Sequence, residues 1–359
     1  MRLGLILAAL LLFATQAATA QECPRGASRW TDTELGVWRA LCAGATADIT
    51  PPYGGMEPPQ AGQPSPENLL TAAFLRTILT EQPYSTAIQS VHIVGALVVG
   101  VLDLTGAAVR HDVVFEESHF LDGIVLDDMQ AAGTWAFLHC YVPAALSARR
   151  ARVQGGFSLA RSYIVNGADL SGLSVGGDVV LRNLATRGIL AANLAAGASL
   201  HLEGIAAANG ELLLPGATIG VDATIVPDSA LTALDLQGAT IGGTLTLGRL
   251  TWAGRPRLDL TGTKVAALVT GGALPADTGM AYGAMAAALA AGGNPTAAAA
   301  VLRSGLEQER AAGPLGRRLW LTLRKWTTDY GAPGGYARLA ALAIAAGLIA
   351  GARLRRKRS

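Results

Sequence analysis

Apolar residues recur every eleven positions through the middle of the chain, with polar residues between them. The first such row is Leu102, Val113, Ile124, Trp135, Leu146, Phe157, Ala168, Val179 and Leu190. A second row starts two residues later at Leu104 and runs to Leu181, and a third runs from Val109 until Thr186 ends it. The spacing of two between the first and second rows is the side-chain period of a β-strand.

Glycine recurs in step with these rows, two positions after a leucine. The Leu-x-Gly units begin at Leu104, Leu170, Leu202, Leu214, Leu236 and Leu260. Gly216 and Gly238 lie 22 residues apart, which is twice the eleven-residue period. The phase slips by a residue near Leu202 and again near Ile225, where we expect corners of a different length.

An eleven-residue repeat also matches about three turns of an α-helix, so a right-handed coiled coil is the alternative. The paired apolar positions and the recurring glycine argue against it, because glycine is unfavourable inside helices. We therefore predict a mainly β fold, a β-solenoid in which two eleven-residue units make a coil of about 22 residues. Residues 88–272 then form roughly eight coils, which stack into a rod about 40 Å long at about 4.8 Å per coil.

Helical patterns flank the repeat on both sides. Residues 66–87 follow Ser65 as N-cap with Pro66 in the first turn, and residues 279–330 predict three further helices. An uncovered solenoid end exposes unpaired strand edges, so we interpret 66–87 and the helix pair within 280–312 as caps. Residues 21–65 are predicted to be an N-terminal segment that ends in a linker rich in Pro and Gly.

The third of these helices combines aromatic and basic residues. It starts at Pro314 and contains Trp320, Trp326 and Tyr330 among Arg317, Arg318, Arg324 and Lys325. This pattern favours a juxtamembrane helix that lies on anionic lipid. The alternative is an ordinary packed helix whose cations are solvated.

The two ends of the chain have the composition of membrane-targeting segments. Residues 1–20 combine one early charge, an apolar core and an Ala-x-Ala box, which predicts a cleaved signal peptide. Residues 336–352 are apolar and precede a basic tail at 353–359, which predicts one transmembrane helix with a cytoplasmic tail. A buried or surface helix, or a cleavable sorting signal after Gly334 and Gly335, are the alternatives.

The charge distribution agrees with this topology. The net charge of +2 becomes 2 − 6 = −4 when Arg2 and the five cations of the tail are removed. A mildly acidic body on a basic tail fits a bacterial inner-membrane protein whose body faces the periplasm. No strong positive charge points to nucleic acid as a partner.

The chain has three cysteines. Cys23 and Cys42 flank a short helical pattern, so in an oxidising compartment they are candidates for a disulfide. Cys140 is then left as a small buried residue of the repeat. No Cys/His spacing predicts a metal site.

The repeat resembles a diverged bacterial branch of the pentapeptide-repeat proteins, through runs such as VHIVGALVVGVLDLTGAAV and FSLARSYIVNGADLSGLSVGGDVVL. The motif is degenerate, and Ala-Asp-Leu is clear only at Ala168 to Leu170. The resemblance implies a right-handed parallel β-helix, quadrilateral in section, with helical caps and a C-terminal membrane anchor. Members are sometimes labelled membrane-associated oxidoreductases. The chain has no Gly-x-Gly-x-x-Gly after a strand and no Walker lysine, so we predict no cofactor.

One acidic cluster is the best candidate for chemistry. It comprises Asp112, Glu116, Glu117, Asp122, Asp127 and Asp128, with His111, His119 and His139 nearby. Paired carboxylates of this kind serve polysaccharide-cleaving enzymes. One coil later, however, Asp127 meets Arg149, Asp128 meets Arg150 and Glu117 meets His139, which favours a charge ladder on an exposed face. His119, Tyr141 and Tyr163 also lie 22 apart and predict a polar-aromatic stack. We therefore assign no catalytic residue.

The favoured function is a membrane-tethered, non-enzymatic β-solenoid that serves as a rigid interaction or scaffold module for an unidentified envelope protein. Its second partner is the lipid of the inner membrane, through the C-terminal helix. One alternative is a scaffold that polymerises end to end, as bactofilins do, although caps would oppose it. The other alternative is an enzyme that acts on envelope polysaccharide.

Overall fold

The computed structural model describes residues 23–51, 66–255, 257–272, 274, 278–312, 314–328 and 330. The predicted signal peptide (1–20), transmembrane helix (336–352) and basic tail (353–359), and most of the Pro- and Gly-rich linker, lie outside the described residues. Among the helices that are described, none has both the length and the apolar composition needed to cross a bilayer.

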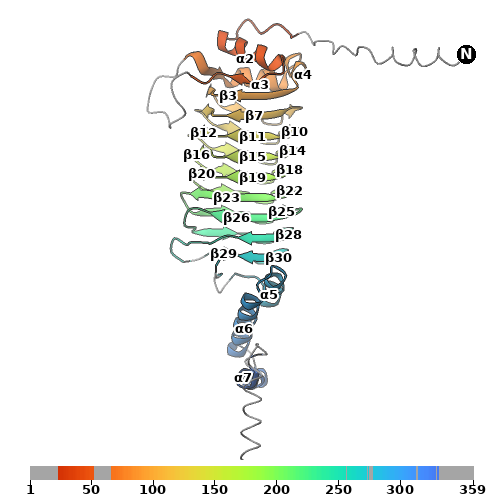
Figure 1. Cartoon of the computed structure of the whole chain (residues 1–359), viewed down its shortest axis with the longest axis vertical. Helices are drawn as coiled ribbons and strands as arrows, with labels where there is room; N and C mark the ends of the chain where they lie inside the picture. The colour runs from red at the N-terminus through yellow and green to blue at the C-terminus, as the bar shows by residue number, and fades with distance from the viewer. Residues whose placement is uncertain are drawn as a thin grey trace, which may run out of the picture.

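The repeat is a parallel β-solenoid, and its long axis runs along the stack of coils in Figure 1. Each complete coil contributes a strand to each of four columns. The first column is β3 (Ser90–Val94), β7 (Asp112–Glu116), β11 (Trp135–Leu138), β15 (Phe157–Ala160), β19 (Val179–Arg182), β23 (Leu200–Ala207), β26 (Ala223–Pro227), β28 (Thr240–Leu247) and β30 (Lys264–Thr270). The second is β4 (Leu97–Val99), β8 (His119–Phe120), β12 (Tyr141–Val142), β16 (Tyr163–Ile164), β20 (Ala185–Thr186) and the end of β23.

The third column is an eight-stranded sheet of its own, which fits the predicted number of coils. It consists of β5 (Leu102–Asp103), β9 (Ile124–Val125), β13 (Leu146–Ser147), β17 (Ala168–Asp169), β21 (Ile189–Leu190), β24 (Glu211–Leu213), β27 (Ala233–Asp235) and β29 (Leu258–Asp259). The fourth is β6 (Ala108–Val109), β10 (Gln130–Ala131), β14 (Arg152–Val153), β18 (Ser174–Val175), β22 (Ala195–Ala196), β25 (Thr218–Ile219) and the start of β28.

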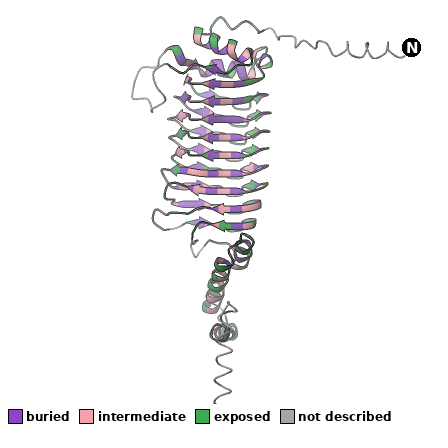
Figure 2. Cartoon of the chain, in the orientation of Figure 1, coloured by how far each residue is buried: buried purple, intermediate pink, exposed green. Residues whose placement is uncertain are grey.

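The predicted apolar rows form the interior of the rod. The register pairs Val113 with Trp135 and Trp135 with Phe157, which are steps of 22 residues. Members of the second and third rows are buried from end to end, including the polar Thr186 that closes the third. Figure 2 shows the same alternation of buried and exposed positions in each strand. The prediction of a solenoid with a coil of about 22 residues is confirmed.

The predicted position of the first phase slip is wrong. Ala168 pairs with Ile189, a step of 189 − 168 = 21, and Ile189 pairs with Leu212, a step of 212 − 189 = 23. The slip therefore precedes Leu202. Ile189 takes the inward position of the first row and Leu190, predicted to be internal, is exposed. One missing residue is enough because strand side chains alternate between the two faces.

Large side chains fill the widest part of the core. The Phe115 and Phe137 rings stack with their centroids 5.7 Å apart, and Phe120 meets Phe115 edge-on at 5.1 Å. These rings come from neighbouring coils, so their contact joins one coil to the next.

Residues in left-handed backbone conformation occupy the corners. The glycines of the Leu-x-Gly units have φ near +70°, for example +70° at Gly172 and +68° at Gly238. At equivalent corners the chain instead places larger side chains, such as Asp128 (φ 57°) and Arg150 (φ 54°). A side chain in this conformation costs about 1–2 kcal/mol, so these corners expose charged groups at a cost in stability.

The N-terminal end is covered by α2 (Asp32–Cys42), α3 (Ala72–Thr80) and α4 (Tyr84–Ala87), which lie above the first coil in Figure 1. The predicted helix start at Pro66 is wrong. Residues Pro66–Asn68 form the short 3₁₀ helix η1, and Leu69–Thr71 form strand β2, which pairs with β4. The open edge of β4 takes these backbone groups. Thr71 then caps α3, its side chain accepting from the Phe74 N–H at 3.1 Å.

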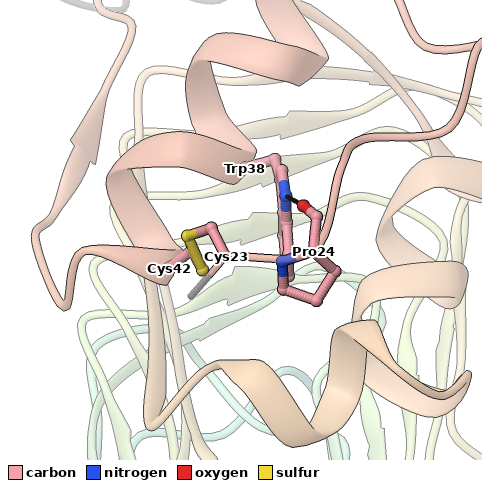
Figure 3. The surroundings of a disulfide bond; sticks show 4 residues. All are labelled: Cys23, Pro24, Trp38 and Cys42. Carbon is pink, nitrogen blue, oxygen red and sulfur yellow. Dashed lines mark hydrogen bonds between the residues drawn. A yellow bond between two sulfur atoms is a disulfide. The ribbon is translucent and has the colours of Figure 1, made fainter. Parts of the chain in front are cut away.

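Part of the predicted N-terminal segment also joins the rod, because β1 (Ala47–Asp48) pairs with β3. A disulfide joins Cys23 to Cys42, whose Cα atoms are 5.8 Å apart (Figure 3). Beside it, the Trp38 indole N–H donates to the Pro24 carbonyl at 2.9 Å. These two links fix the first described residues to α2.

The C-terminal helices are α5 (Tyr282–Ala291), α6 (Pro295–Ala312) and α7 (Leu315–Thr328), close to the predicted bounds. α5 packs against the last coil and buries Met285 and Leu289 there. α6 packs on α5 and α7 on α6, and the three continue along the long axis beyond β30 in Figure 1. Of the predicted pair of capping helices, α5 is the one that meets the coils.

Candidate interaction surfaces

The acidic candidates are largely engaged in holding neighbouring coils together. The Asp112 carboxylate accepts from the Thr134 N–H at 2.6 Å, Asp122 from the Gly100 N–H at 2.8 Å, and Asp127 from the Arg149 N–H at 2.9 Å. Each of these bonds spans 22 residues. The same role recurs outside the cluster, where Asp222 accepts from Thr244 at 2.6 Å.

The predicted charge ladder is confirmed for two of its three pairs. Arg150 donates to both carboxylate oxygens of Asp128, at 2.8 and 2.7 Å, and this hydrogen bonding lowers the pKa of Asp128. The Arg149 Nε lies 3.3 Å from Asp127 Oδ2 and 3.6 Å from Asp169 Oδ2. These alternating charges connect three successive coils.

The other acidic and basic candidates are dispersed. Glu116 pairs with His92 at 3.2 Å, and the His111 Nε2 contacts the Ser85 carbonyl at 2.7 Å below the N-terminal helices. Glu117 and His139 line one hollow, described next. Within the described residues, no group of three or more His, Cys, Asp or Glu side chains is placed to hold a metal ion.

A hollow of about 230 Å³ lies beside the second column of strands. Its lining residues are Glu117, His119, His139, Cys140, Tyr141, Arg161 and Tyr163. The strand register brings His119, Tyr141 and Tyr163 into one line, with the His119 and Tyr141 rings 5.3 Å apart, so the predicted polar-aromatic stack is confirmed. Glu117, His139 and Arg161 form the adjacent corner, all with positive φ.

The titratable groups of this hollow do not supply a nucleophile at neutral pH. Burial raises the pKa of the Cys140 thiol to about 12, so it stays protonated. Burial also lowers the pKa of His119, so its ring stays neutral. The Arg161 guanidinium contacts the His139 ring at 3.4 Å. The hollow therefore offers hydrogen-bonding and aromatic contacts rather than an activated side chain.

A second hollow, of about 430 Å³, lies where the coil length changes. The corner between the second and third columns has three residues from Thr186 to Ile189, against four from Ile164 to Ala168. This shorter corner recedes between its neighbours. Arg187 and Leu190 line the hollow it leaves.

The two hollows flank one exposed apolar surface, which we call the docking surface: Tyr163, Val165 and Leu190, exposed by 57%, 47% and 40%. Arg161 and Arg187 lie at its margin, one in the lining of each hollow. The sequence carried a signal for this surface. Ile164 is an inward row position, so Tyr163 and Val165 on either side of it must point outward.

A second exposed apolar surface lies on α7. Leu315, Leu319, Trp320 and Leu323 are exposed by 55% to 76%, whereas Leu321 on the same helix is fully buried. The buried side of α7 is held to α6 by ion pairs, Arg317 to Glu309 at 2.8 Å and Lys325 to Glu307 at 2.6 Å. The side turned away from α6 is apolar.

A scan of protein-family models and searches of curated proteins and of solved structures found no match to this chain. The chain is thus defined as a β-solenoid of about eight coils, compatible with a β-helix repeat protein. The narrower resemblance to pentapeptide-repeat proteins and the oxidoreductase grouping stay predictions.

Proposed function

We propose that this chain is a membrane-tethered, non-enzymatic β-solenoid whose docking surface binds a protein of the bacterial envelope, with the body in the periplasm. The observation that carries the proposal is the docking surface itself. Three apolar side chains stand exposed on paired strands, between two hollows and beside two arginines. Contiguous exposed apolar groups with a polar rim are typical of protein-protein interfaces.

The rigidity of the support favours binding over catalysis. Tyr163 lies on β16, which is paired on both sides by β12 and β20, so the surface needs little ordering when a partner binds. The carboxylates that an enzyme would use are occupied by neighbouring coils at Asp112, Asp122 and Asp127. End-to-end polymerisation is disfavoured because α3 and α5 lie where the next copy would pair.

Site-specific photo-crosslinking in intact envelopes tests this proposal. A photoreactive residue is placed at Val165, and in a matched control at Val221, which is also 47% exposed but lies on a coil outside the docking surface. We expect one discrete protein adduct from position 165, absent from position 221 and abolished by Leu190→Arg. Equal adducts from both positions, or an adduct that survives Leu190→Arg, would refute the docking surface.

A reporter fused after Ser359 tests the tether separately. Activity in the cytoplasm is expected if residues 336–352 span the membrane. Exported activity would contradict the proposed topology.

A further inference from the structure

We propose that α7 lies flat on the anionic surface of the bilayer, with Leu315, Leu319, Trp320 and Leu323 in the lipid. This inference deepens the proposed membrane attachment and rests on it. The four residues are the most exposed large apolar group among the described helices. Nothing in the described part of the chain covers them.

The angular distribution of residues around α7 supports a bilayer as the occupant. Residues advance by about 100° around a helix, so Leu315, Leu319 and Leu323 form one stripe and Trp320 widens it. Leu321, which is buried, lies on the opposite side of the helix. Such a broad apolar stripe parallel to the helix axis matches the plane of a membrane interface.

The charges of α7 support an anionic surface. By the same helical geometry, Arg324 follows one edge of the apolar stripe and Arg318 the other. α7 contains no acidic residue between Leu315 and Thr328. Cations that border an apolar stripe meet phosphate groups when the stripe enters the acyl region, and anionic lipids attract them further.

The position of α7 in the chain adds an independent argument. α7 ends at Thr328, and the apolar residues 336–352 and the basic tail begin only eight positions later. A helix tied so closely to a membrane-spanning segment is held near the headgroups. The consequence is a fixed orientation, because α5 and α6 connect α7 to the last coil and the N-terminal helices lie at the far end of the rod (Figure 1).

The experiment places an environment-sensitive fluorophore on α7 in the full chain, reconstituted into vesicles. The three native cysteines are a bonded pair and a buried thiol, so Leu319→Cys supplies the accessible labelling site. Val221→Cys on the solenoid is the matched control. The vesicles contain either zwitterionic lipid alone or zwitterionic with anionic lipid, each with and without a lipid that carries a nitroxide near its headgroup.

We expect a blue shift and nitroxide quenching at position 319 in the anionic vesicles, a weaker effect in zwitterionic vesicles, and neither effect at position 221. A blue shift without quenching means that protein covers the stripe, from this chain or, if it grows with protein concentration, from a second copy. Either result overturns the proposal, as does no shift or quenching that is equal in both lipids. Failure of the tether is distinguishable, because the chain would then not remain with the vesicles.

Discussion

Replacing Phe137 by alanine tests the stacked core most directly. Phe137 is 1% exposed and its ring lies 5.7 Å from Phe115, 5.8 Å from Phe120 and 6.2 Å from Trp135. Loss of a buried phenylalanine costs about 3–5 kcal/mol in unfolding free energy, through lost burial and the cavity left behind. Phe115 comes from the preceding coil, so few of its lost contacts can be recovered by local movement. Urea unfolding followed by circular dichroism measures the change.

A double-mutant cycle separates coil stacking from general core loss. Phe115→Leu and Phe137→Leu are expected to couple by about 0.5–1.5 kcal/mol, the range for an aromatic pair in contact. Phe137→Leu combined with Leu245→Ala, in a coil farther along the rod, is the control and is expected to be additive. Additive behaviour of the Phe115 and Phe137 changes, or a loss below about 1 kcal/mol for Phe137→Ala, would refute the assigned register.

Three further outcomes are expected. Cys42→Ser opens a crosslink between residues 19 apart and is expected to lower the unfolding free energy by about 3 kcal/mol without reductant, and by nothing further with it. His119 has its pKa lowered by burial, so the unfolded chain takes up the proton first; stability is full above pH 6.5 and falls below it, and His119→Gln is expected to flatten that part of the pH profile of unfolding. Hydrogen bonding from Lys325 lowers the pKa of Glu307 to about 2, so its attachment of α7 to α6 is present above pH 4.5 and lost as the pH falls toward 2; hydrogen exchange in α7 measures this, and Glu307→Gln is expected to exchange faster at neutral pH.

The sequence predicted the solenoid because its core depends on a repeat that each coil must obey. Side chains two apart share a face, so the rows through Leu102 and Leu104 indicated both strand and inward direction before any coordinates. The caps were harder to predict. Leu69–Thr71 became a strand because the edge of β4 was free, and a local helical pattern carries no information about a distant unpaired edge. Leu190 was assigned to the wrong face because a one-residue slip inverts each later position.

The docking surface lies beside the place where the repeat is broken. In a uniform solenoid the corners align and the faces are flat, so no position is distinguished from its neighbours along the rod. One corner shortened by a residue at Arg187 recedes, leaves a hollow and turns Leu190 outward next to Val165 and Tyr163. The neighbouring coil of 23 residues restores the phase, so the change stays local and the rod beyond it continues in register. A pair of compensating changes in coil length thus creates a distinct surface while the stacked core remains intact, which explains why specificity in this molecule follows the departures from its period.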